Sequence, residues 1–383
     1  MSDASSLVSG TDTETGFMRA ICARRDLYHG IQTVSRAIAG RSAWPILNNV
    51  LMRTEEGCVR LTAFDLELGI ECTVPAVIEE HGSLTVPARL IAEMLSTLPE
   101  SDVEISVDEQ NAVNVKCQKS NYTLLGLPPE EFRSLPEIPD DRSLEITQSA
   151  LHEMIRQTIF AVSLDESRAI MTGILLVLNG AELTFVGLDQ HRLAVRSATV
   201  ANASGEASCI VPRRVLDEVS RLLQDEDSPV AISIADSQIK FIVNGVEIVS
   251  RLIEGQFPNY ERVIPKEYQK RLTIPTDTFL SCVRRVSIVA RESANRVAFR
   301  AEDDRLIITA ESGDIGKAYE EIEIVKEGED IEIAFNGKYL MEFLNVVGTE
   351  GIFVELTGSM SPGLLRPVGR DDYLYVLSPM QMV

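Results

Sequence analysis

The sequence predicts an α+β fold made of three repeated domains. A short β-run followed by an amphipathic helix recurs along the chain, and the isoleucines Ile21, Ile146 and Ile274 mark its copies about 125 residues apart. Runs of alternating apolar and polar residues, separated by turn residues, lie between the helices and indicate antiparallel strands. Strands and helices do not alternate one for one, which disfavours a doubly wound parallel sheet. We expect two helices packed on antiparallel sheets in each repeat, with about eight short strands.

The second helix of each repeat has the clearest pattern. In Ser208–Leu223 an apolar run ends at Val211-Pro212, and proline suits the first turn of a helix because its missing N–H costs nothing there. The stretches Ser83–Leu98 and Asp330–Val347 have the same design. In Ser208–Leu223, helical spacing predicts a buried face made of Val215, Leu216, Val219, Leu222 and Leu223.

The first helix of each repeat follows a β-run in Arg19–Ala39, Ser143–Ser163 and Arg271–Ala290. Polar residues at the helix starts can accept a hydrogen bond from a free backbone N–H. We expect Ser149 to cap the second of these helices, and Thr276 or Asp277 to cap the third.

The repeats predict domains at residues 17–142, 143–268 and 269–383. The links between them, Leu135–Ser143 and Ile264–Lys270, are polar and contain proline. Residues 1–16 are rich in Ser, Thr, Asp and Gly and predict a disordered tail.

Composition places the chain among globular proteins, with 383 residues that are 45% hydrophobic and 25% charged. No apolar run reaches the roughly 18–20 residues of a membrane helix, and the N-terminus lacks the pattern of a secretion signal. The scattered cysteines suggest a reduced cytoplasmic protein with neither zinc nor disulfides. These cysteines are Cys22, Cys58, Cys72, Cys117, Cys209 and Cys282.

Motifs of catalysis are missing from the sequence. It has no phosphate-binding or dinucleotide-binding glycine loop, no H-E-x-x-H motif and no G-x-S-x-G elbow, and its four histidines lack partners at metal-ligand spacing. We therefore expect no metal, no cofactor and no enzyme activity. The one suggestive cluster is Asp189, His191 and Arg192, which could be general-base chemistry or a polar turn before an apolar strand. The turn is the favoured reading.

Charge is segregated along the chain. The net charge of −22 argues against DNA binding, since phosphate contacts need Lys and Arg. Yet the six predicted helical stretches contain more basic than acidic residues, whereas the rest of the chain is strongly acidic. A basic strip on an acidic body attracts a polyanion to one surface only. Without a base-reading motif, any DNA contact would be to the backbone and independent of sequence.

Several motifs in matching order resemble the bacterial sliding clamp, the β subunit of the replicative DNA polymerase III. They are GRSAWPILNNVL (Gly40–Leu51), TAFDLELGIE (Thr62–Glu71), LDQHRLAV (Leu188–Val195), GQFPNYERVIP (Gly255–Pro265), FNGKYLMEFLN (Phe335–Asn345) and SPM (Ser378–Met380). The resemblance covers residues 17–383. It implies a chain that forms half of a closed ring, built head to tail as a homodimer, with helices lining the hole. Double-stranded DNA threads the hole, and the ring tethers the polymerase and confers processivity.

The resemblance also implies site residues. Partner proteins (the polymerase III catalytic subunit, the clamp loader and other clamp-motif proteins) would insert a short Gln-containing, Leu/Phe-ended peptide into a pocket. The matching pocket positions are Met171, Leu188, His191, Arg192, Leu193, Pro258, Arg262, Val263, Asn336, Tyr339, Met360, Val376, Leu377, Pro379 and Met380. The family's usual Thr-Asp-Gly-His-Arg is Leu188-Asp189-Gln190-His191-Arg192 here, and its usual Met-Pro-Met-Arg-Leu end is Ser378–Val383.

For DNA, the matching positions are Arg41, Arg168, Arg213 and Arg214. For the dimer interface they are Tyr122 and Leu124 against Ile288 and Val289. Lys119 could pair with Glu320 or Glu321 across that interface. The alternative is a monomeric peptide-docking adaptor that forms no ring.

Overall fold

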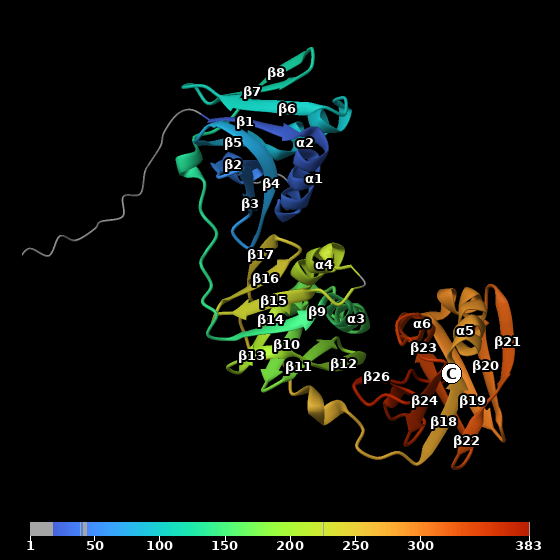
Figure 1. Cartoon of the computed structure of the whole chain (residues 1–383). Helices are drawn as coiled ribbons and strands as arrows, with labels where there is room; N and C mark the ends of the chain where they lie inside the picture. The colour runs from blue at the N-terminus through green and yellow to red at the C-terminus, as the bar shows by residue number, and fades with distance from the viewer. Residues whose placement is uncertain (1–17, 39, 41–43, 225, 383) are drawn as a thin grey trace, which may run out of the picture. The chain divides into compact units, whose positions relative to one another are not determined.

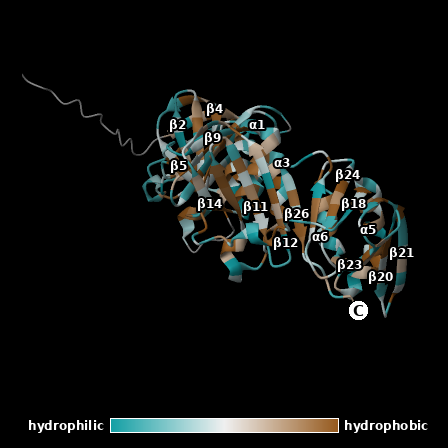
Figure 2. Cartoon of the chain, turned by 90° about the horizontal axis from the view of Figure 1, so that it is seen from below, coloured by the Kyte–Doolittle hydropathy of each residue, from teal (hydrophilic) through white to brown (hydrophobic). Residues whose placement is uncertain are grey.

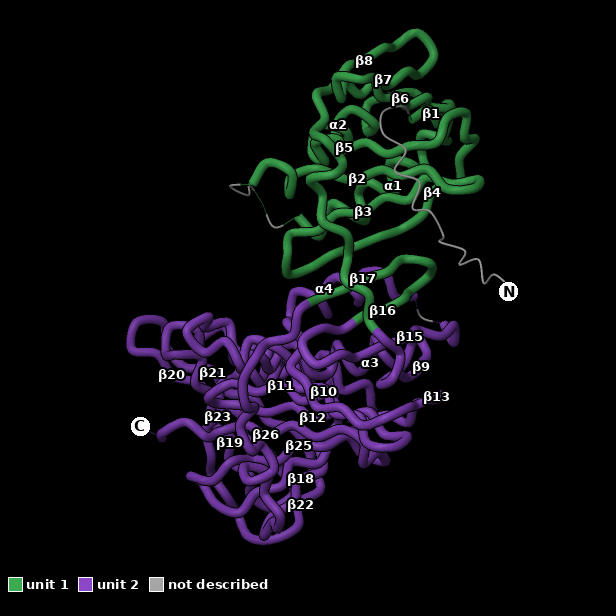
Figure 3. Tube along the Cα trace, turned by 90° about the vertical axis from the view of Figure 1, so that its left-hand side faces the viewer, with its two compact units in different colours: residues 1–138, 240–250 green, residues 139–239, 251–383 purple. Residues whose placement is uncertain are grey.

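The computed structural model describes residues 18–38, 40, 44–224 and 226–382. It divides into two compact units, one of Met1–Ile138 with Lys240–Ser250, and one of Pro139–Ile239 with Arg251–Val383 (Figure 3). We call them unit 1 and unit 2. The predicted tail (residues 1–16) and Arg41 lie outside the described residues.

The first repeat lies in unit 1 (Figure 1). Its strands are β1 (Met18–Ala23), β2 (Asn49–Glu55), β3 (Cys58–Phe64), β4 (Leu68–Glu80), β5 (Ser83–Pro87), β6 (Asp102–Val107), β7 (Ala112–Cys117) and β8 (Ser120–Leu125). Its helices are α1 (Arg24–Val34) and α2 (Ala88–Thr97), with the 3-10 turns η1 (Ser35–Ala37), η2 (Pro45–Asn48) and η3 (Pro129–Glu131). The two helices pack side by side, and Leu27, Ile31, Ile91 and Leu95 are buried.

The second repeat has the same order of elements. Its strands are β9 (Ser143–Thr147), β10 (Gly173–Asn179), β11 (Glu182–Leu188), β12 (Arg192–Thr199), β13 (Ala201–Ser204), β14 (Ala207–Pro212), β15 (Pro229–Ile234), β16 (Gln238–Val243) and β17 (Val246–Arg251). Its helices are α3 (Gln148–Thr158) and α4 (Arg213–Leu222), with η4 (Ile159–Ala161), η5 (Glu166–Met171) and η6 (Tyr260–Val263).

The third repeat follows within unit 2. Its strands are β18 (Lys270–Pro275), β19 (Arg296–Glu302), β20 (Arg305–Ser312), β21 (Gly316–Glu323), β22 (Val325–Glu327), β23 (Ile331–Asn336), β24 (Gly351–Leu356), β25 (Gly363–Pro367) and β26 (Tyr373–Leu377). Its helices are α5 (Thr276–Ala290) and α6 (Gly337–Leu344), with the turn η7 (Arg291–Ser293). The repeated α+β architecture that the periodicity predicts is confirmed.

A nine-stranded sheet joins the second and third repeats within unit 2. Its order is β14-β10-β11-β12-β26-β25-β24-β18-β22, and the join is the antiparallel pair of β12 with β26. Phe185, Ala194 and Tyr375 are buried on one face, while Val186 packs on the other with half-buried Val195. Strands with apolar residues on both faces indicate a sheet that is covered on both sides. Figure 2 shows the hydrophobic colouring along β11 and β14.

Charged side chains reinforce the join between these repeats. Glu153 on α3 accepts from Arg370 at 2.8 Å and from Arg196 at 2.9 Å, and Arg196 also contacts Asp372 at 2.5 Å. The buried hydroxyl of Tyr373 donates to the backbone oxygen of Gln157 at 2.9 Å. The contacts of Arg370, Asp372 and Tyr373 therefore link α3 and β12 of the second repeat to β26 and the residues just before it.

The predicted helix caps were wrong. Helix α3 begins at Gln148, and the hydroxyl of Thr147, not that of Ser149, accepts from the backbone N–H of Ala150. Helix α5 begins at Thr276 directly after Pro275, so Thr276 and Asp277 both lie inside the helix. A β-strand runs straight into each helix here, which moves the start earlier than the polar residues suggest. In α4 the predicted buried face holds, except that Leu222 is only half-buried.

Candidate functional site

One face of the nine-stranded sheet forms an apolar floor. Directly paired residues make a row across five strands, from β14 to β26, and this row consists of Ile210, Leu175, Val186, Val195 and Leu374. A second row, of Leu188, Leu193, Val376 and Leu364, crosses β11, β12, β26 and β25. Both rows belong to a single apolar cluster, and several members are only half-buried. We call this surface the floor.

A cavity of about 510 Å³ opens beside the turn between β11 and β12. Its lining joins that turn to α6, to the start of β19 and to the end of the chain, and consists of His191, Ser293, Ala294, Arg296, Asn336, Tyr339, Ser378, Pro379, Met380 and Gln381. The rings of His191 and Tyr339 stack with centroids 6.4 Å apart. Most of its lining side chains are polar, with Ala294, Pro379 and Met380 as the apolar part, so the cavity can orient the polar groups of a ligand. We call this hollow the rim cavity.

The turn beside the rim cavity is held by Asp189. Its carboxylate accepts from the backbone N–H groups of His191 at 2.8 Å and Arg192 at 3.0 Å, and from Arg192 Nε at 2.9 Å. The carboxylate contacts the backbone of His191 rather than its ring, so these residues do not form the acid–base pair of a hydrolase. Asp189, His191 and Arg192 therefore form a structural turn, which is the interpretation that the sequence favoured.

Arg192 is the most buried charge at the site. Its guanidinium lies 4.0 Å from the ring centre of Tyr339 and 5.7 Å from that of Phe160, and it also bonds Glu342 on α6. Burial lowers the pKa of Arg192, but Tyr375, Glu342 and Asp189 together raise it above its ordinary value. The cation thus fixes Tyr339, one wall of the rim cavity, against the β11–β12 turn.

Backbone hydrogen bonds hold the C-terminal segment in place. The N–H of Ser378 donates to the oxygen of His191 and that of Met380 to the oxygen of Ala334, both at 2.8 Å. Asn336 caps α6 by accepting from the N–H groups of Lys338 and Tyr339. The wall formed by Pro379 and Met380 is therefore anchored.

The structure brings together most of the predicted pocket residues. His191, Asn336, Tyr339, Pro379 and Met380 line the rim cavity, and Leu188, Leu193 and Val376 lie in the floor. Leu377 pairs with Arg192 but is buried in the core on the opposite face. Four other predicted positions line neither the rim cavity nor the second cavity described below. They are half-buried Met171 and the exposed Arg262, Val263 and Met360.

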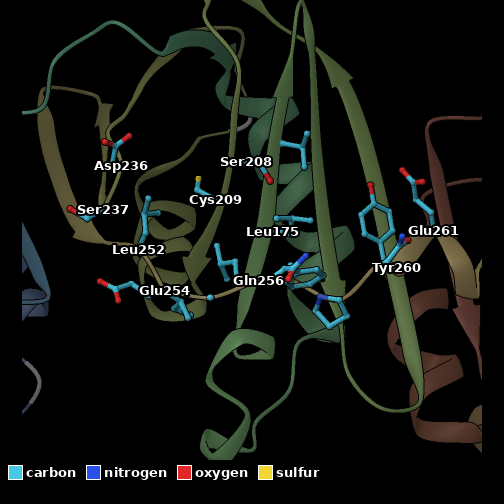
Figure 4. A pocket seen from close by; sticks show the side chains of 17 residues that line it. Leu175, Ser208, Cys209, Asp236, Ser237, Leu252, Glu254, Gln256, Tyr260 and Glu261 are labelled. Carbon is cyan, nitrogen blue, oxygen red and sulfur yellow. The ribbon is translucent and has the colours of Figure 1, made fainter.

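A second cavity, of about 770 Å³, was not predicted. It lies over β10 and β14 beneath the segment Leu252–Glu261, and Figure 4 shows the side chains that line it. Of the predicted pocket residues only Pro258 belongs to it. The signal in the sequence was the run Ile174–Leu178, which is apolar at successive positions and therefore has two faces to cover. We call this cavity the flank groove.

The predicted DNA-binding arginines lie on short helical segments. Arg213 and Arg214 begin α4 and are half-buried, and Arg213 Nε lies 3.4 Å from Asp217. Arg168 is exposed in η5. With the Gln190 amide turned so that its oxygen faces Arg168, this oxygen accepts from the two terminal nitrogens of Arg168 at 2.8 and 3.0 Å. That bond ties Arg168 to the same turn that borders the rim cavity.

The predicted interface residues lie on an edge strand and on a helix. Tyr122 is exposed and Leu124 half-buried on β8, the last strand of its sheet in unit 1. Ile288, with 61% of its surface exposed, and half-buried Val289 lie on α5 in unit 2. Glu320 already bonds Arg285, and Glu321 accepts from Tyr319. An unpaired edge strand and an exposed aliphatic side chain are both surfaces that favour covering by another chain.

Among the described residues no group of His, Cys, Asp and Glu side chains is arranged to hold a metal ion. The helices of the described part of the chain are all too short or too polar to cross a membrane. Burial raises the pKa of Cys22 and Cys72 to about 12, so these thiols stay protonated and serve as small apolar groups.

Comparison with known proteins gives one family for all three repeats. Models of the DNA polymerase III beta subunit match residues 18–136 as its N-terminal domain, 145–259 as its central domain and 261–381 as its C-terminal domain. The beta sliding clamp of Staphylococcus aureus is 32% identical over 356 residues, which is 90% of this chain and 94% of that protein. That of Synechococcus elongatus is 33% identical over 374 residues, with 95% and 100% covered.

Solved structures agree with the sequence relatives. The sliding clamp of Bacillus subtilis has a TM-score of 0.92 at 31% identity, and covers 96% of this chain and 100% of its own. The Pseudomonas aeruginosa clamp bound to griselimycin has a TM-score of 0.90 at 32% identity, with the same coverage. The chain therefore belongs to the family of the bacterial DNA polymerase III beta subunit, the sliding clamp of DNA replication.

Proposed function

We propose that this chain forms a head-to-tail dimeric ring around duplex DNA and tethers the polymerase by a peptide bound across the floor and the rim cavity. The observation that carries the peptide site is the half-buried apolar floor, which ends at the polar rim of His191, Asn336 and Tyr339. An extended peptide can lay apolar side chains on such a floor while the rim fixes its polar groups. The polymerase III catalytic subunit, the clamp loader and other clamp-motif proteins would share this site.

The proposed DNA contacts are sequence-independent. Arg168, Arg213 and Arg214, together with Arg41, would face the backbone of DNA in the hole of the ring. Because the chain carries a net charge of −22, retention on DNA would come from topology rather than from tight phosphate binding. The protein would act as a non-catalytic processivity factor in the cytoplasm.

The proposal also includes domain boundaries at 142/143 and 268/269. It places the dimer interface where Tyr122 and Leu124 of one chain meet Ile288 and Val289 of the other. A ring that closes after two chains needs a head-to-tail contact between different surfaces, and these residues lie on different units.

The test compares closed circular DNA with the same DNA cut once. After loading, we expect the chain to stay on the circle through gel filtration and to leave the linear form by sliding off its ends. Equal retention on both forms would contradict the ring. A chain that stays monomeric at micromolar concentration but still binds clamp-motif peptides would favour the adaptor instead.

A further inference from the structure

The flank groove is continuous with the proposed peptide site. Leu175 and Ile210 line the groove and also belong to the first row of the floor, which ends at Leu374 on β26. Phe257 and Tyr260 of the covering segment line the groove and pack on the same apolar cluster. A chain lying across the floor can therefore continue into the groove without crossing a polar barrier.

The rim of the groove is acidic. Asp236, Glu254 and Glu261 line it, whereas none of its described lining residues is Lys, Arg or His. Asp236 is neutralised by Arg142 at 2.5 Å, but Glu254 and Glu261 are exposed and form no ion pair within the described part of the chain. Figure 4 shows Glu254 and Glu261 toward opposite ends of the covering segment.

The rim cavity has the opposite character. Its described lining residues include Arg296 and His191, and none of them is acidic. The two cavities at the ends of one apolar floor therefore differ in charge, which gives a bound chain a preferred direction and a preferred composition at each end.

The interior of the flank groove suits an uncharged side chain. Leu175, Val177 and Ile210 supply apolar surface. Burial raises the pKa of the Cys209 thiol to about 12, so this residue adds no negative charge. The acidic character is confined to the mouth, where a lysine or arginine can keep its charge in water while its aliphatic stem lies on apolar surface.

We propose that the flank groove binds the residues next to the clamp-binding motif of a partner peptide, and that it selects an apolar side chain bracketed by lysine or arginine. This rests on the proposed function, because it assigns the groove to the same peptide. The groove extends recognition beyond the motif itself and would distinguish among partners that share that motif.

The test uses synthetic fluorescent peptides that share one Gln-containing, Leu/Phe-ended core. One has only the core, and the others add Lys-Leu-Lys, Ser-Leu-Ser or Glu-Leu-Glu, placed in turn before and after it. In fluorescence anisotropy we expect the lysine version to bind about two- to fivefold more tightly than the serine version at low salt, as solvent-exposed ion pairs allow. High salt should reduce that difference.

The charge-neutral pair Glu254→Gln with Glu261→Gln should bind the lysine and serine peptides equally and leave the affinity for the core unchanged. The matched pair Glu267→Gln with Glu329→Gln, which removes two exposed charges outside the groove, should keep the preference. If the unmodified chain shows no preference for the lysine peptide, or if that preference survives the groove substitutions, the proposal for the flank groove is wrong while the peptide site stands. Failure of every peptide, the core included, overturns the peptide site and the groove with it.

Discussion

Arg192 connects the β11–β12 turn to α6, two segments that are far apart in the sequence. Its guanidinium lies against Tyr339 of α6 and bonds Asp189 of the β11–β12 turn and Glu342. The Arg192 side chain is only 8% exposed, and its acidic partners Asp189 and Glu342 are themselves largely shielded from water. Removal of one member of a buried ion pair leaves the others desolvated without compensation.

We expect Arg192→Met to lower the free energy of unfolding by about 2–4 kcal/mol, because Asp189 and Glu342 would lose their shared cation. Urea unfolding measures this, and peptide affinity should fall as Tyr339 loses its support. The exposed Lys266→Met is the control and should change stability by less than about 0.5 kcal/mol. Equal stabilities of the two variants would show that the network contributes nothing.

Glu153 predicts a dependence of stability on pH. Desolvation raises its pKa, but hydrogen bonds from Arg370 and Arg196 outweigh this and lower the pKa of Glu153 to about 2. The folded pKa lies below the unfolded one, so the stabilisation is complete above about pH 4.3 and is lost as the pH falls toward 2. Because the side chain is 36% exposed, solvent screening limits the effect to about 1 kcal/mol.

The measurement compares the unmodified chain with Glu153→Gln between pH 6 and pH 3, as a difference in unfolding free energy. The difference should shrink as the pH falls. The exposed Glu267→Gln should show little difference at any pH. A difference for Glu153→Gln that is constant over this range would mean that the carboxylate charge is not what the two arginines stabilise.

At the scale of elements, β11 crosses closely beneath the end of α3. A Cβ added to Gly187 would collide with the backbone oxygen of Thr158 and lie 3.1 Å from Ile174. The strand approaches the helix at the point where only glycine leaves room, and the turn that starts two residues later borders the rim cavity.

We expect Gly187→Ala to destabilise the chain by about 1–3 kcal/mol, since a backbone oxygen cannot move as a flexible side chain can. The midpoint of urea unfolding reports it. Gly313→Ala serves as the control, because its added Cβ would meet nothing within 4 Å. If the two variants unfold at the same midpoint, the close approach of β11 and α3 is not a constraint.

At the scale of the whole molecule, the proposed ring depends on α5. Ile288→Asp places a charge on an exposed position, so the fold should survive while the dimer dissociates. Sedimentation should give the mass of one chain, 42.3 kDa. Leu164→Asp, at a side chain that is 79% exposed in the central repeat, should leave the dimer intact. A dimer that persists in Ile288→Asp would place the interface elsewhere.

Periodicity was sufficient to predict the architecture but not its details. The positions Val215, Leu216 and Val219 are buried as their spacing predicts, because a helix repeats its faces regularly. The caps were missed because the start of a helix depends on how the preceding strand enters it, as at Thr147 and Pro275.

The site was only partly predictable, because part of it depends on residues that meet only in the folded chain. The motifs named His191, Asn336 and Met380, and the structure brings these three residues to one cavity. The stacking of Arg192 on Tyr339 could not be foreseen from local sequence, because it joins residues far apart in the chain. The flank groove was missed because it needs β10, β14 and the segment Leu252–Glu261 to meet in space.

The nine-stranded sheet has a consequence for cooperativity. Since β12 and β26 are neighbours in one hydrogen-bonded ladder, the second and third repeats cannot separate without breaking that ladder and the contacts of Glu153 and Tyr373 beside it. We therefore expect unit 2, which holds most of the second repeat and all of the third, to melt in one calorimetric transition as a block larger than unit 1. Scanning calorimetry that resolved three equal transitions would contradict this, and an Arg370→Ala variant should begin to divide the larger block.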